Sequence, residues 1–455
     1  MTPVTAAPEG DVHARVSALV RRYGWNATSF QVLEPGYRYF FHGPDAAVAY
    51  VDTGRAWVAA GAPLADEESI IAAADAFTVA ARAAGRRASF FATEERFATR
   101  APLRSLLVGE QASWDTAGWD AALAGSRSLR EQLRRARAKG VRVRALDALE
   151  ATAPGAPART AVLALVDRWL RGRELAPLGF LARVDPSGFL ADHRLFLAER
   201  DGELVALLSV APIWGRAGWL LQNLMRVPEA PNGAGELLID AAMREARARG
   251  HTYVTLGLAP LAGDVPPPLR LARVAGGSLY DFEGLRAFKA KLRPARWDPV
   301  FLSFPPATGA VRAIVDVLAA FSRGGLLRFG LRTLARGPAV VVQLLALLLV
   351  PWTALLAAAP AARWFPSPAV KWTWVGFDVA LAAGLITLTV RWRAGLAHLL
   401  AIAIGADAVV TAVEAASWNV PRARGPVEWL VLAAAVVAPA FAFALLWRAV
   451  RRRRG

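Results

Sequence analysis

The sequence has no cysteine among its 455 residues. This absence excludes disulfide bonds, catalysis by a thiolate and zinc sites built on cysteine. Histidine is also scarce: the five histidines are scattered, and none forms an HxH or HxxxH pair with the spacing of a metal site. A GxSxG segment, the signature of a serine nucleophile elbow, is missing as well. We therefore expect chemistry that uses neither a metal nor a bound cofactor.

Acidic residues are few. Lysine and arginine number 54 against 37 aspartates and glutamates, which gives a net charge of +17 and a pI near 11.2. Such an imbalance is typical of proteins that contact nucleic acid or anionic lipid, and charge alone does not distinguish these partners. Segment 1–24 carries charged residues where a secretory signal needs an uninterrupted apolar core, so the first half is predicted to stay in the cytoplasm.

Long apolar runs are absent before about residue 336 and dominate afterwards. Four segments, each about the twenty residues needed to cross a bilayer, lie near 339–359, 370–390, 396–416 and 429–450. The acidic residues between Gly337 and Gly455 are only Asp378, Asp407, Glu414 and Glu428. The sequence therefore predicts an all-α bundle of four transmembrane helices over residues 337–455.

Arginines indicate how this bundle is oriented. They gather before the first apolar segment, between the second and third, and at the chain end: Arg328, Arg332, Arg336, Arg391, Arg393 and Arg451 to Arg454. Under the positive-inside rule these sites face the cytoplasm, although Arg422 and Arg424 in an outer loop are an exception. We expect a multi-pass protein of the bacterial cytoplasmic membrane, with the soluble part and both termini in the cytoplasm.

Two features of the apolar half carry further expectations. Segment 306–336 joins the two parts, and within it Val311 to Leu334 mixes apolar residues with arginine at helical spacing. It is predicted to be an amphipathic linker on the inner leaflet.

Asp407 and Glu414, two helical turns apart and near His398, share one face of the third segment. They form either a helix-packing contact or part of a pathway that moves lipid between leaflets.

The soluble part alternates strand-like and helix-like segments, which predicts an α/β fold with a mixed sheet. Strand patterns occur in VAYVDTGRAWVAAG, ASFFAT and LFLAERDGELVALLSVAPIW. The predicted boundary between two halves lies near residues 145–158, where the stretch LDALEATAPGAPART is rich in Ala and Pro.

Three motifs in order carry a family resemblance. NLMRVPEAPNG is followed by a strand ending in LGLAPLAG and then by YDFEGLRAFKAKLRP, while the basic block LREQLRRARAKGVRV precedes them. From roughly Gly24 to Phe304 the chain resembles the C-terminal synthase domain of bacterial phosphatidylglycerol lysyltransferases, the aminoacyl-tRNA-dependent multiple peptide resistance factors. In that family a much larger membrane domain precedes the synthase domain, whereas here a short apolar part follows it.

The resemblance implies two tandem acetyltransferase-like (GNAT-type) halves, 1–150 and 151–305, with the presumed active site in the second. It also implies a reaction in which an aminoacyl group moves from charged tRNA, a co-substrate, to a hydroxyl of phosphatidylglycerol. The product lowers the negative charge of the membrane surface. Because the aminoacyl ester is already activated, no covalent enzyme intermediate is required.

Arg226 matches the arginine of the family's DLMR pattern, which is implicated in holding the aminoacyl end of the donor. Asn223 stands where that pattern has aspartate, and Phe189 lies near a position where the family tends to carry tyrosine. Asparagine cannot pair electrostatically with an ammonium, so a lysyl donor loses an expected contact. The transferred group can therefore be a neutral aminoacyl group such as alanyl, and the acceptor can be another lipid.

The segment from Tyr280 to Pro294 supplies the other predicted catalytic groups. Arg286, Lys289 and Arg293 recur at helical spacing and are expected to share one face, which is either an anionic-substrate site or a solvated basic face. Lys289, with Arg286 and Lys291 beside it, is predicted to contact the oxyanion or the lipid phosphate. The proton acceptor is Asp281, Glu283 or His251, or the ribose of the substrate itself.

Two further sites are predicted for anions. Asn232 caps a helix whose first amides, from Gly233 to Glu236, point at a phosphate or simply form an ordinary capped start. Arg130, Arg134 and Arg137 form one stripe of a basic helix, suited to the phosphates of tRNA or to solvent.

Other classes of function stay open from the residues alone. The chain could be a non-catalytic acetyltransferase-like module that binds lipid or nucleic acid on a membrane anchor. It could also be an acyl-CoA-dependent N-acyltransferase. The oligomeric state is not indicated by the sequence.

Overall fold

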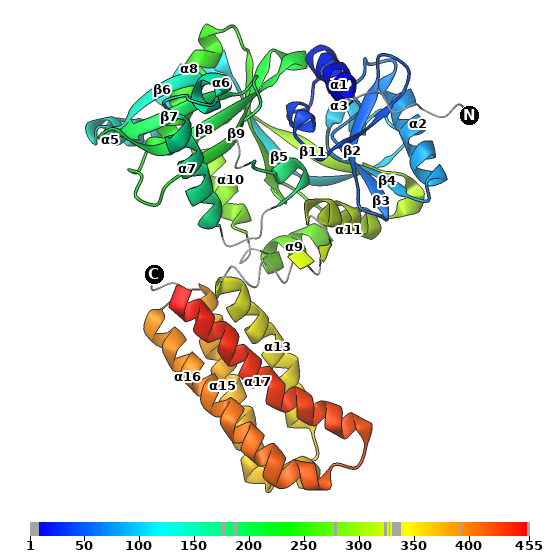
Figure 1. Cartoon of the computed structure of the whole chain (residues 1–455), viewed down its shortest axis with the longest axis vertical. Helices are drawn as coiled ribbons and strands as arrows, with labels where there is room; N and C mark the ends of the chain where they lie inside the picture. The colour runs from blue at the N-terminus through cyan, green and yellow to red at the C-terminus, as the bar shows by residue number, and fades with distance from the viewer. Residues whose placement is uncertain are drawn as a thin grey trace. The chain divides into compact units, whose positions relative to one another are not determined.

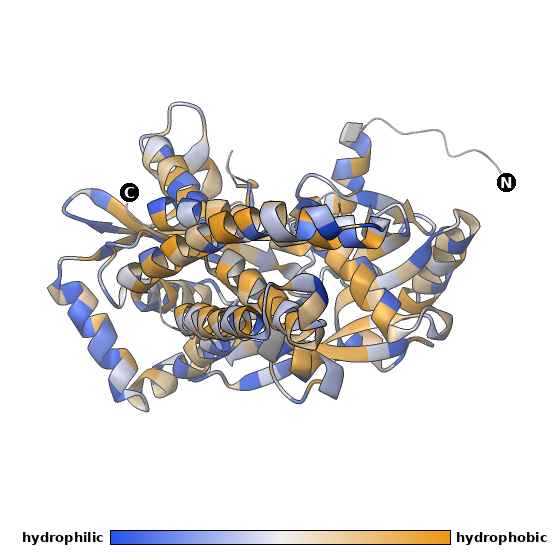
Figure 2. Ribbon diagram, turned by 90° about the horizontal axis from the view of Figure 1, so that it is seen from below, coloured by the Kyte–Doolittle hydropathy of each residue, from blue (hydrophilic) through white to orange (hydrophobic). Residues whose placement is uncertain are grey.

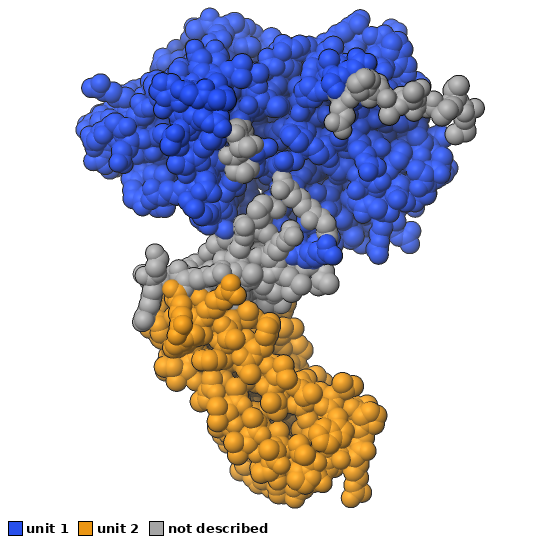
Figure 3. Space-filling model, in the orientation of Figure 1, with its two compact units in different colours: residues 1–173, 177–329 blue, residues 174–176, 330–455 orange. Residues whose placement is uncertain are grey.

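The structure, a computed structural model, describes residues 9–173, 178–185, 189–276, 280–322, 325–326, 328–329, 338–390 and 393–452. The chain divides into two compact units (Figure 3). Unit 1 comprises residues 1–173 and 177–329, and unit 2 comprises residues 174–176 and 330–455.

Unit 1 is built around a mixed sheet of eleven strands in the order β1-β2-β3-β4-β11-β5-β10-β9-β8-β7-β6 (Figure 1). The strands are β1 (Arg38–Phe41), β2 (Ala47–Asp52), β3 (Ala56–Ala60), β4 (Arg87–Glu94), β5 (Arg104–Asp115), β6 (Arg142–Asp147), β7 (Arg194–Arg200), β8 (Glu203–Ile213), β9 (Gly218–Arg226), β10 (Tyr253–Pro260) and β11 (Arg296–Phe304). Among the strands that the structure describes, β3 with β4 and β9 with β10 pair in parallel, and the other pairs are antiparallel. The mixed α/β sheet predicted from the sequence is therefore confirmed.

Helices lie between these strands along the chain. The α-helices of unit 1 are α1 (Glu9–Tyr23), α2 (Ile70–Ala83), α3 (Glu95–Ala98), α4 (Trp119–Ala124), α5 (Arg127–Ala138), α6 (Ala148–Thr152), α7 (Arg159–Arg171), α8 (Ala234–Ala248), α9 (Pro267–Gly276), α10 (Phe282–Lys291) and α11 (Ala310–Phe321). The 3-10 turns are η1 (Phe30–Leu33), η2 (Thr116–Gly118), η3 (Phe180–Ala182), η4 (Trp214–Arg216) and η5 (Pro306–Thr308).

Alternation along each strand gives the sheet two buried faces. In β7, Leu195 and Leu197 join a core with α7, whereas Phe196 and Ala198 join a core with α5 and α8. The N-terminal strands are likewise covered by α2 on one face and by α1 and α11 on the other. Because both faces are covered, functional groups must lie at strand ends or where strands separate.

Strand β11 belongs to the second half of the sequence but pairs with strands of the first half. β11 pairs with β4 and β5, and β5 in turn pairs with β10. Strands from both sides of residue 150 therefore interleave at the centre of one continuous sheet. The division into tandem halves 1–150 and 151–305 stays a prediction.

Helix α11 lies within the predicted linker 306–336. It packs on the sheet through Ala313, Val317 and Ala320, and its buried Asp316 pairs with Arg87 through two hydrogen bonds of 2.6 and 2.8 Å. The helix thus belongs to unit 1, while residues 323–324, 327 and 330–337 of the predicted linker lie outside the described residues.

Unit 2 contains the apolar helices α13 (Pro338–Ala358), α15 (Pro368–Val390), α16 (Ala394–Glu414) and α17 (Pro426–Arg452), with the short elements α14 (Ala361–Trp364), η6 (Ala415–Asn419) and η7 (Val420–Arg422). Figure 2 colours these helices mostly in the hydrophobic range. By length and composition, three described stretches can cross a membrane: Pro368–Leu388, Ala394–Arg422 and Pro426–Arg448. Leu345–Ala358 is a shorter apolar helix, so the fourth span stays a prediction.

Two carboxylates of α16 in unit 2 accept hydrogen bonds, one from a neighbouring helix and one from α16 itself. Trp374 Nε1 donates to Glu414 at 2.8 Å, and Thr411 Oγ1 donates to Asp407 at 3.0 Å within α16. Hydrogen bonds of this kind offset the cost of placing carboxylates among apolar helices. The contact of Glu414 with α15 agrees with the helix-packing interpretation, whereas that interpretation of Asp407 stays a prediction.

Candidate active site

The parallel strands β9 and β10 separate in the middle of the sheet. They pair only from Gly218 with Tyr253 to Leu220 with Thr255, although β9 continues to Arg226 and β10 continues to Pro260. On its other side β10 pairs with β5, with an irregularity between Thr255 and Leu258. The divergence leaves backbone groups of both strands without a ladder partner, and such groups need other partners or a ligand.

Lys289 of α10 satisfies the freed carbonyls of β10. Its ammonium donates to the carbonyl oxygens of Leu256, Gly257 and Leu258 at 2.9, 2.7 and 2.9 Å, and the residue is only 3% exposed. A lysine ammonium has three N–H donors, so all of them are used. This geometry does not match the direct oxyanion or lipid contact predicted for Lys289. It indicates instead that the lysine holds the separated strand in place.

Burial lowers the pKa of Lys289 to about 7. The three carbonyls oppose this effect, because they accept from every N–H of the ammonium and therefore favour the charged form.

The predicted common basic face of Arg286, Lys289 and Arg293 is wrong. Lys289 is buried, whereas Arg286 is exposed, with its guanidinium 4.7 Å from the Trp297 ring centroid. Arg293 lies beyond the end of α10 at Lys291, in a left-handed conformation with φ of 54°. Spacing alone predicted the shared face, but the helix is too short to include Arg293.

Arg226 stands at the end of β9 on the surface. Among the described residues, no side chain pairs with its guanidinium, so the group is open to an anion. Asn223, three residues earlier, instead projects from the other face of the strand, where its Nδ2 donates to Ser209 Oγ at 3.2 Å. The two residues predicted to act as a pair on the donor therefore point in opposite directions.

The start of α8 differs from the prediction in its capping residue. Gly233, not Asn232, occupies the N-cap, with φ of 93°, and no side chain caps the helix. A Cβ on Gly233 would lie 2.3 Å from the carbonyl oxygen of Gln132 in α5, so a glycine is required there. The exposed Asn232 is left at the surface beside this turn.

Glu236 and Lys291 form an ion pair at the first turn of α8. Lys291 Nζ lies 2.9 Å from Glu236 Oε1, and the two side chains are 30% and 10% exposed. The carboxylate suits the positive end of the helix dipole. The pair joins α8 to α10, so both predicted substrate contacts are already engaged with each other.

The candidate proton acceptors occupy three different settings. Asp281 caps α10 by accepting from the amide of Gly284 at 2.7 Å, whereas Glu283 is exposed in the first turn of that helix. His251 precedes β10, at the end opposite to the Lys289 contacts, and its ring centroid lies 4.8 Å from that of Trp219. Burial lowers the pKa of His251. Only Glu283 is both solvent-accessible and uncommitted among the described contacts.

The basic stripe on α5 makes several contacts within unit 1. Arg130 donates to the carbonyl of Leu123 at 2.8 Å, Arg134 pairs with Glu131 at 2.8 Å, and Arg137 pairs with buried Asp240 at 2.9 Å. Arg134 and Arg137 remain 71% and 57% exposed, so they can still reach a phosphate. The Arg134–Glu131 pair lies at the surface and contributes little to stability, whereas the carboxylate of Asp240 is buried.

A hydrogen-bonded chain that the sequence did not predict lies next to Asn223. His193 Nε2 lies 2.9 Å from Gln222 Oε1, and Gln222 Nε2 donates to Glu34 Oε1 at 2.9 Å. The Phe189 ring centroid is 5.6 Å from that of His193. Glu34 and Gln222 are 188 residues apart in the chain, so no local pattern could reveal this contact.

We predict that Glu34 makes the stability of unit 1 depend on pH. Burial raises the pKa of Glu34 from 4.5 to about 7, whereas the hydrogen bond from Gln222 lowers it. The folded state therefore holds the proton more tightly than the unfolded state. The resulting stabilisation is complete below pH 4.5 and is lost as the pH rises through 7.

Glu34→Gln should remove this dependence, because glutamine does not titrate. The unfolding free energy of the intact chain, relative to that of Glu34→Gln, should fall by about 3 kcal/mol between pH 4.5 and 8. Hydrogen exchange of β9 amides in the full chain measures the difference. Glu68→Gln, at an exposed position, is the control, and an equal pH dependence in all three chains would refute the assignment.

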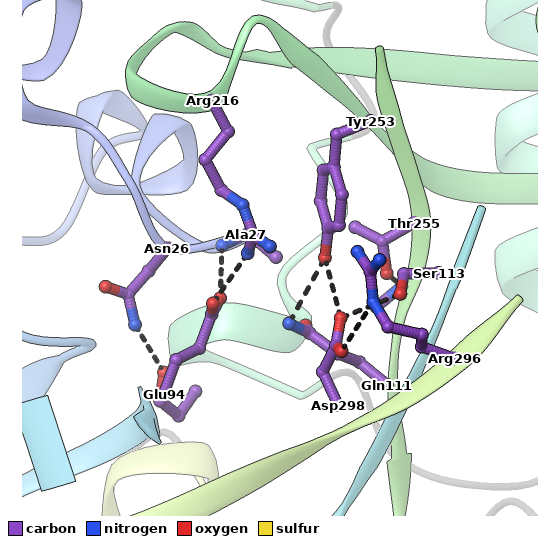
Figure 4. A network of polar contacts seen from close by, with 12 residues as sticks. Asn26, Ala27, Glu94, Gln111, Ser113, Arg216, Tyr253, Thr255, Arg296 and Asp298 are labelled. Carbon is purple, nitrogen blue, oxygen red and sulfur yellow. Dashed lines mark hydrogen bonds and ion pairs between the residues drawn. The ribbon is translucent and has the colours of Figure 1, made fainter. Parts of the chain in front are cut away.

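A second network lies near the centre of the sheet and joins residues from both sides of residue 150 (Figure 4). Arg216 Nη1 donates to Glu94 Oε2 at 2.7 Å, the amide of Ala27 donates to Glu94 Oε1 at 3.1 Å, and both charged side chains are nearly buried. The Arg216 guanidinium lies 3.7 Å from the Tyr253 ring centroid, and Tyr253 in turn contacts Asp298 of β11. Burial raises the pKa of Glu94, whereas the charge of Arg216 lowers it.

Unit 1 is thus a mixed α/β domain in which a parallel pair of strands separates beside a glycine-capped helix. Residues 17–304 match the family model described as phosphatidylglycerol lysyltransferase, C-terminal. The chain therefore belongs to this family, and the resemblance drawn from its motifs is confirmed.

Similar proteins extend this assignment. The chain is 30% identical over 325 residues to the lysylphosphatidylglycerol biosynthesis bifunctional protein LysX of Nocardia farcinica, covering 66% of this chain and 28% of that protein. It is 32% identical over 149 residues to the phosphatidylglycerol lysyltransferase of Bacillus subtilis, covering 30% of this chain and 17% of that protein. The chain thus spans less than a third of the length of these curated relatives.

Two solved structures share the fold. The C-terminal domain of a protein assigned as a lysylphosphatidylglycerol synthetase from Agrobacterium fabrum is 25% identical, with a TM-score of 0.59 over 70% of this chain and 99% of that one. L-PGS from Bacillus licheniformis is 22% identical, with a TM-score of 0.57 over 67% of this chain and 95% of that one. The likeness of the second structure concerns the fold alone.

Proposed function

We propose that the protein transfers an aminoacyl group from a charged tRNA to a hydroxyl of phosphatidylglycerol at the bacterial cytoplasmic membrane. The hydroxyl oxygen attacks the carbonyl carbon of the aminoacyl ester, and the bond to the tRNA ribose breaks. The proton of the lipid hydroxyl passes to the ribose oxygen that leaves. No bound cofactor takes part, and membership of the family over residues 17–304 is the observation that carries the proposal.

Arg226 is the group that we assign to the substrates. Its unpaired, exposed guanidinium beside the separated strands can bind a phosphate or stabilise the tetrahedral oxyanion. Glu283, or the neighbouring ribose hydroxyl of the tRNA, relays the proton. Three described stretches of unit 2 that are long and apolar enough to cross a membrane support a location at the membrane that holds the acceptor lipid.

The transferred amino acid is lysine or a neutral residue such as alanine. Asn223 carries no charge, and its amide is engaged by Ser209 on the opposite face from Arg226. Nothing at this position selects a cationic donor, so we favour the neutral aminoacyl group. Exposed Arg134 and Arg137 on α5 are the surface that we assign to tRNA phosphates.

We predict that Arg226→Ala lowers kcat/KM about 10- to 100-fold, because one charge-assisted contact contributes roughly 1.5 to 3 kcal/mol. The test is a mass-spectrometric lipid profile of a bacterial host that lacks aminoacylated lipids, expressing the intact chain or the variant. A new aminoacyl phosphatidylglycerol should accumulate with the intact chain, and its mass identifies the amino acid.

Arg104→Ala is the matched control, because Arg104 is likewise an exposed arginine at the end of a strand. It should leave the product level unchanged. With purified protein and lipid vesicles, ribonuclease treatment of the donor should abolish transfer. A lipid profile without a new product, despite membrane-inserted and folded protein, would favour a non-catalytic module, and transfer from acyl-CoA without tRNA would favour an N-acyltransferase.

A further inference from the structure

Helix α11 carries an apolar face that no other described part of unit 1 covers. Val311, Val315 and Leu318 are 75%, 42% and 48% exposed. Spaced by four and three residues, they lie on one side of the helix. We call these three residues the α11 outward face. An apolar stripe of this kind on a fixed helix usually marks a contact with a partner or a membrane.

The opposite side of α11 holds the helix rigidly against the sheet. Ala313 and Val317 belong to the core of unit 1, and Asp316 binds Arg87 through both carboxylate oxygens. The side chain of Asp316 is only 3% exposed. The α11 outward face is therefore presented by a folded surface, not by a flexible linker.

The position of α11 in the chain restricts what can cover this face. Only residues 322–337 separate the end of α11 from the start of α13, the first apolar helix of unit 2. Even fully extended, this connection reaches only about 55 Å. A membrane crossed by the helices of unit 2 is thus always within reach of α11.

The charges around the α11 outward face also favour a membrane as its partner. Exposed Arg312 flanks the α11 outward face, and Arg328, Arg332 and Arg336 follow within the connection to unit 2. The carboxylate of Asp316 in this helix is buried and already paired. An apolar stripe flanked by arginines fits the interface of an anionic bilayer, where apolar side chains enter the acyl boundary and cations meet phosphates.

We propose that the α11 outward face lies in the interface of the anionic membrane that unit 2 crosses, and so holds unit 1 against the lipid surface. Helix α9 supplies a second contact: Leu271 is 70% exposed, and α9 lies along the same border of unit 1 as α11 in Figure 1. This inference is independent of the reaction catalysed.

The absence of native cysteine makes a direct test possible. Single-cysteine variants Val311→Cys, Val315→Cys and Leu318→Cys of the full chain are labelled with a nitroxide and reconstituted into vesicles containing phosphatidylglycerol. Collision with oxygen, which concentrates in lipid, is compared with collision with a water-soluble nickel chelate. The oxygen-to-nickel ratio at each α11 position should exceed that of Val79→Cys at least threefold.

Val79 is the matched control, because it is an apolar residue of α2 in the same unit and is 68% exposed. All four substitutions replace exposed side chains, so core packing is preserved. Ratios on α11 equal to that at position 79 would overturn the proposal. Low collision with both reagents, together with spin–spin broadening, would show a second copy of the chain on this face and would also overturn it.

Vesicles without anionic lipid test whether charge contributes to the proposed contact of α11 with the membrane. Vesicles of phosphatidylcholine alone should lower the oxygen-to-nickel ratio at Val315→Cys at least twofold, because the arginines lose their anionic partners. An unchanged ratio would contradict the requirement for anionic lipid. Collision rates do not depend on turnover. A failure of this proposal can therefore be distinguished from a failure of the proposed transferase activity.

Discussion

Lys289→Met should destabilise the region around β10 by about 2 to 4 kcal/mol and reduce turnover with it. The substitution keeps an unbranched side chain but leaves the carbonyls of Leu256, Gly257 and Leu258 without their donor. Each buried acceptor that loses its partner costs about 1 to 3 kcal/mol, and relief of the buried ammonium offsets part of this loss. Hydrogen exchange of β10 and α10 amides in the full chain measures the effect.

Comparing the change in amide protection with the change in kcat distinguishes two roles of Lys289. If Lys289 positions the strand, protection of β10 falls together with kcat, and the KM for lipid changes little. If Lys289 touches the oxyanion or the lipid phosphate, kcat falls while protection stays at the level of the intact chain. Lys139→Met, the same change at the exposed residue that follows α5, should alter protection by less than about 0.5 kcal/mol.

Arg216→Met should destabilise unit 1 by about 3 to 5 kcal/mol. The substitution keeps the packing of a long side chain beside Tyr253 but removes the charge that faces Glu94. A buried carboxylate without its partner costs several kcal/mol, or takes up a proton instead. The melting temperature of the full chain, followed by tryptophan fluorescence, should fall by several degrees, and more at pH 8 than at pH 5.

The double variant Arg216→Met with Glu94→Gln should recover most of this loss, because the uncompensated charge is gone. A cycle over the four chains gives the coupling energy of the pair. Arg22→Met is the control, since the pair of Arg22 with Asp45 is 66% and 60% exposed and should contribute less than about 1 kcal/mol. A double variant as unstable as Arg216→Met would show that the ion pair is not the origin of the loss.

Ordered motifs were enough to indicate the family before the fold was known. NLMRVPEAPNG, LGLAPLAG and YDFEGLRAFKAKLRP are local strings, so a single sequence contains them completely. Alternating apolar patterns likewise predicted a mixed α/β sheet, and runs of about twenty apolar residues predicted membrane helices, three of which meet the criteria over the described residues. These properties depend on neighbouring residues and therefore survive without tertiary information.

The roles of single residues in α10 and α8, by contrast, depend on contacts with distant parts of the chain. Helical spacing placed Lys289 on a surface with Arg286, but spacing does not say which side of a helix meets the sheet. The buried side of α10 was settled by the freed carbonyls of β10, which lie more than thirty residues earlier in the chain. Asn232 has a side chain typical of a helix cap, yet the close approach of α5 at Gln132 selects a glycine at the cap itself.

The sequence by itself determined the family, the alternation of strands and helices, the apolar helices and the excess of positive charge, because each is encoded in composition or short-range order. Only the tertiary structure decided that β11 inserts between β4 and β5, that Gln222 links His193 to Glu34, and that α11 docks on the sheet with one apolar side outward. These features join residues many positions apart. Their free energy comes from burial and pairing in three dimensions, which no local pattern records.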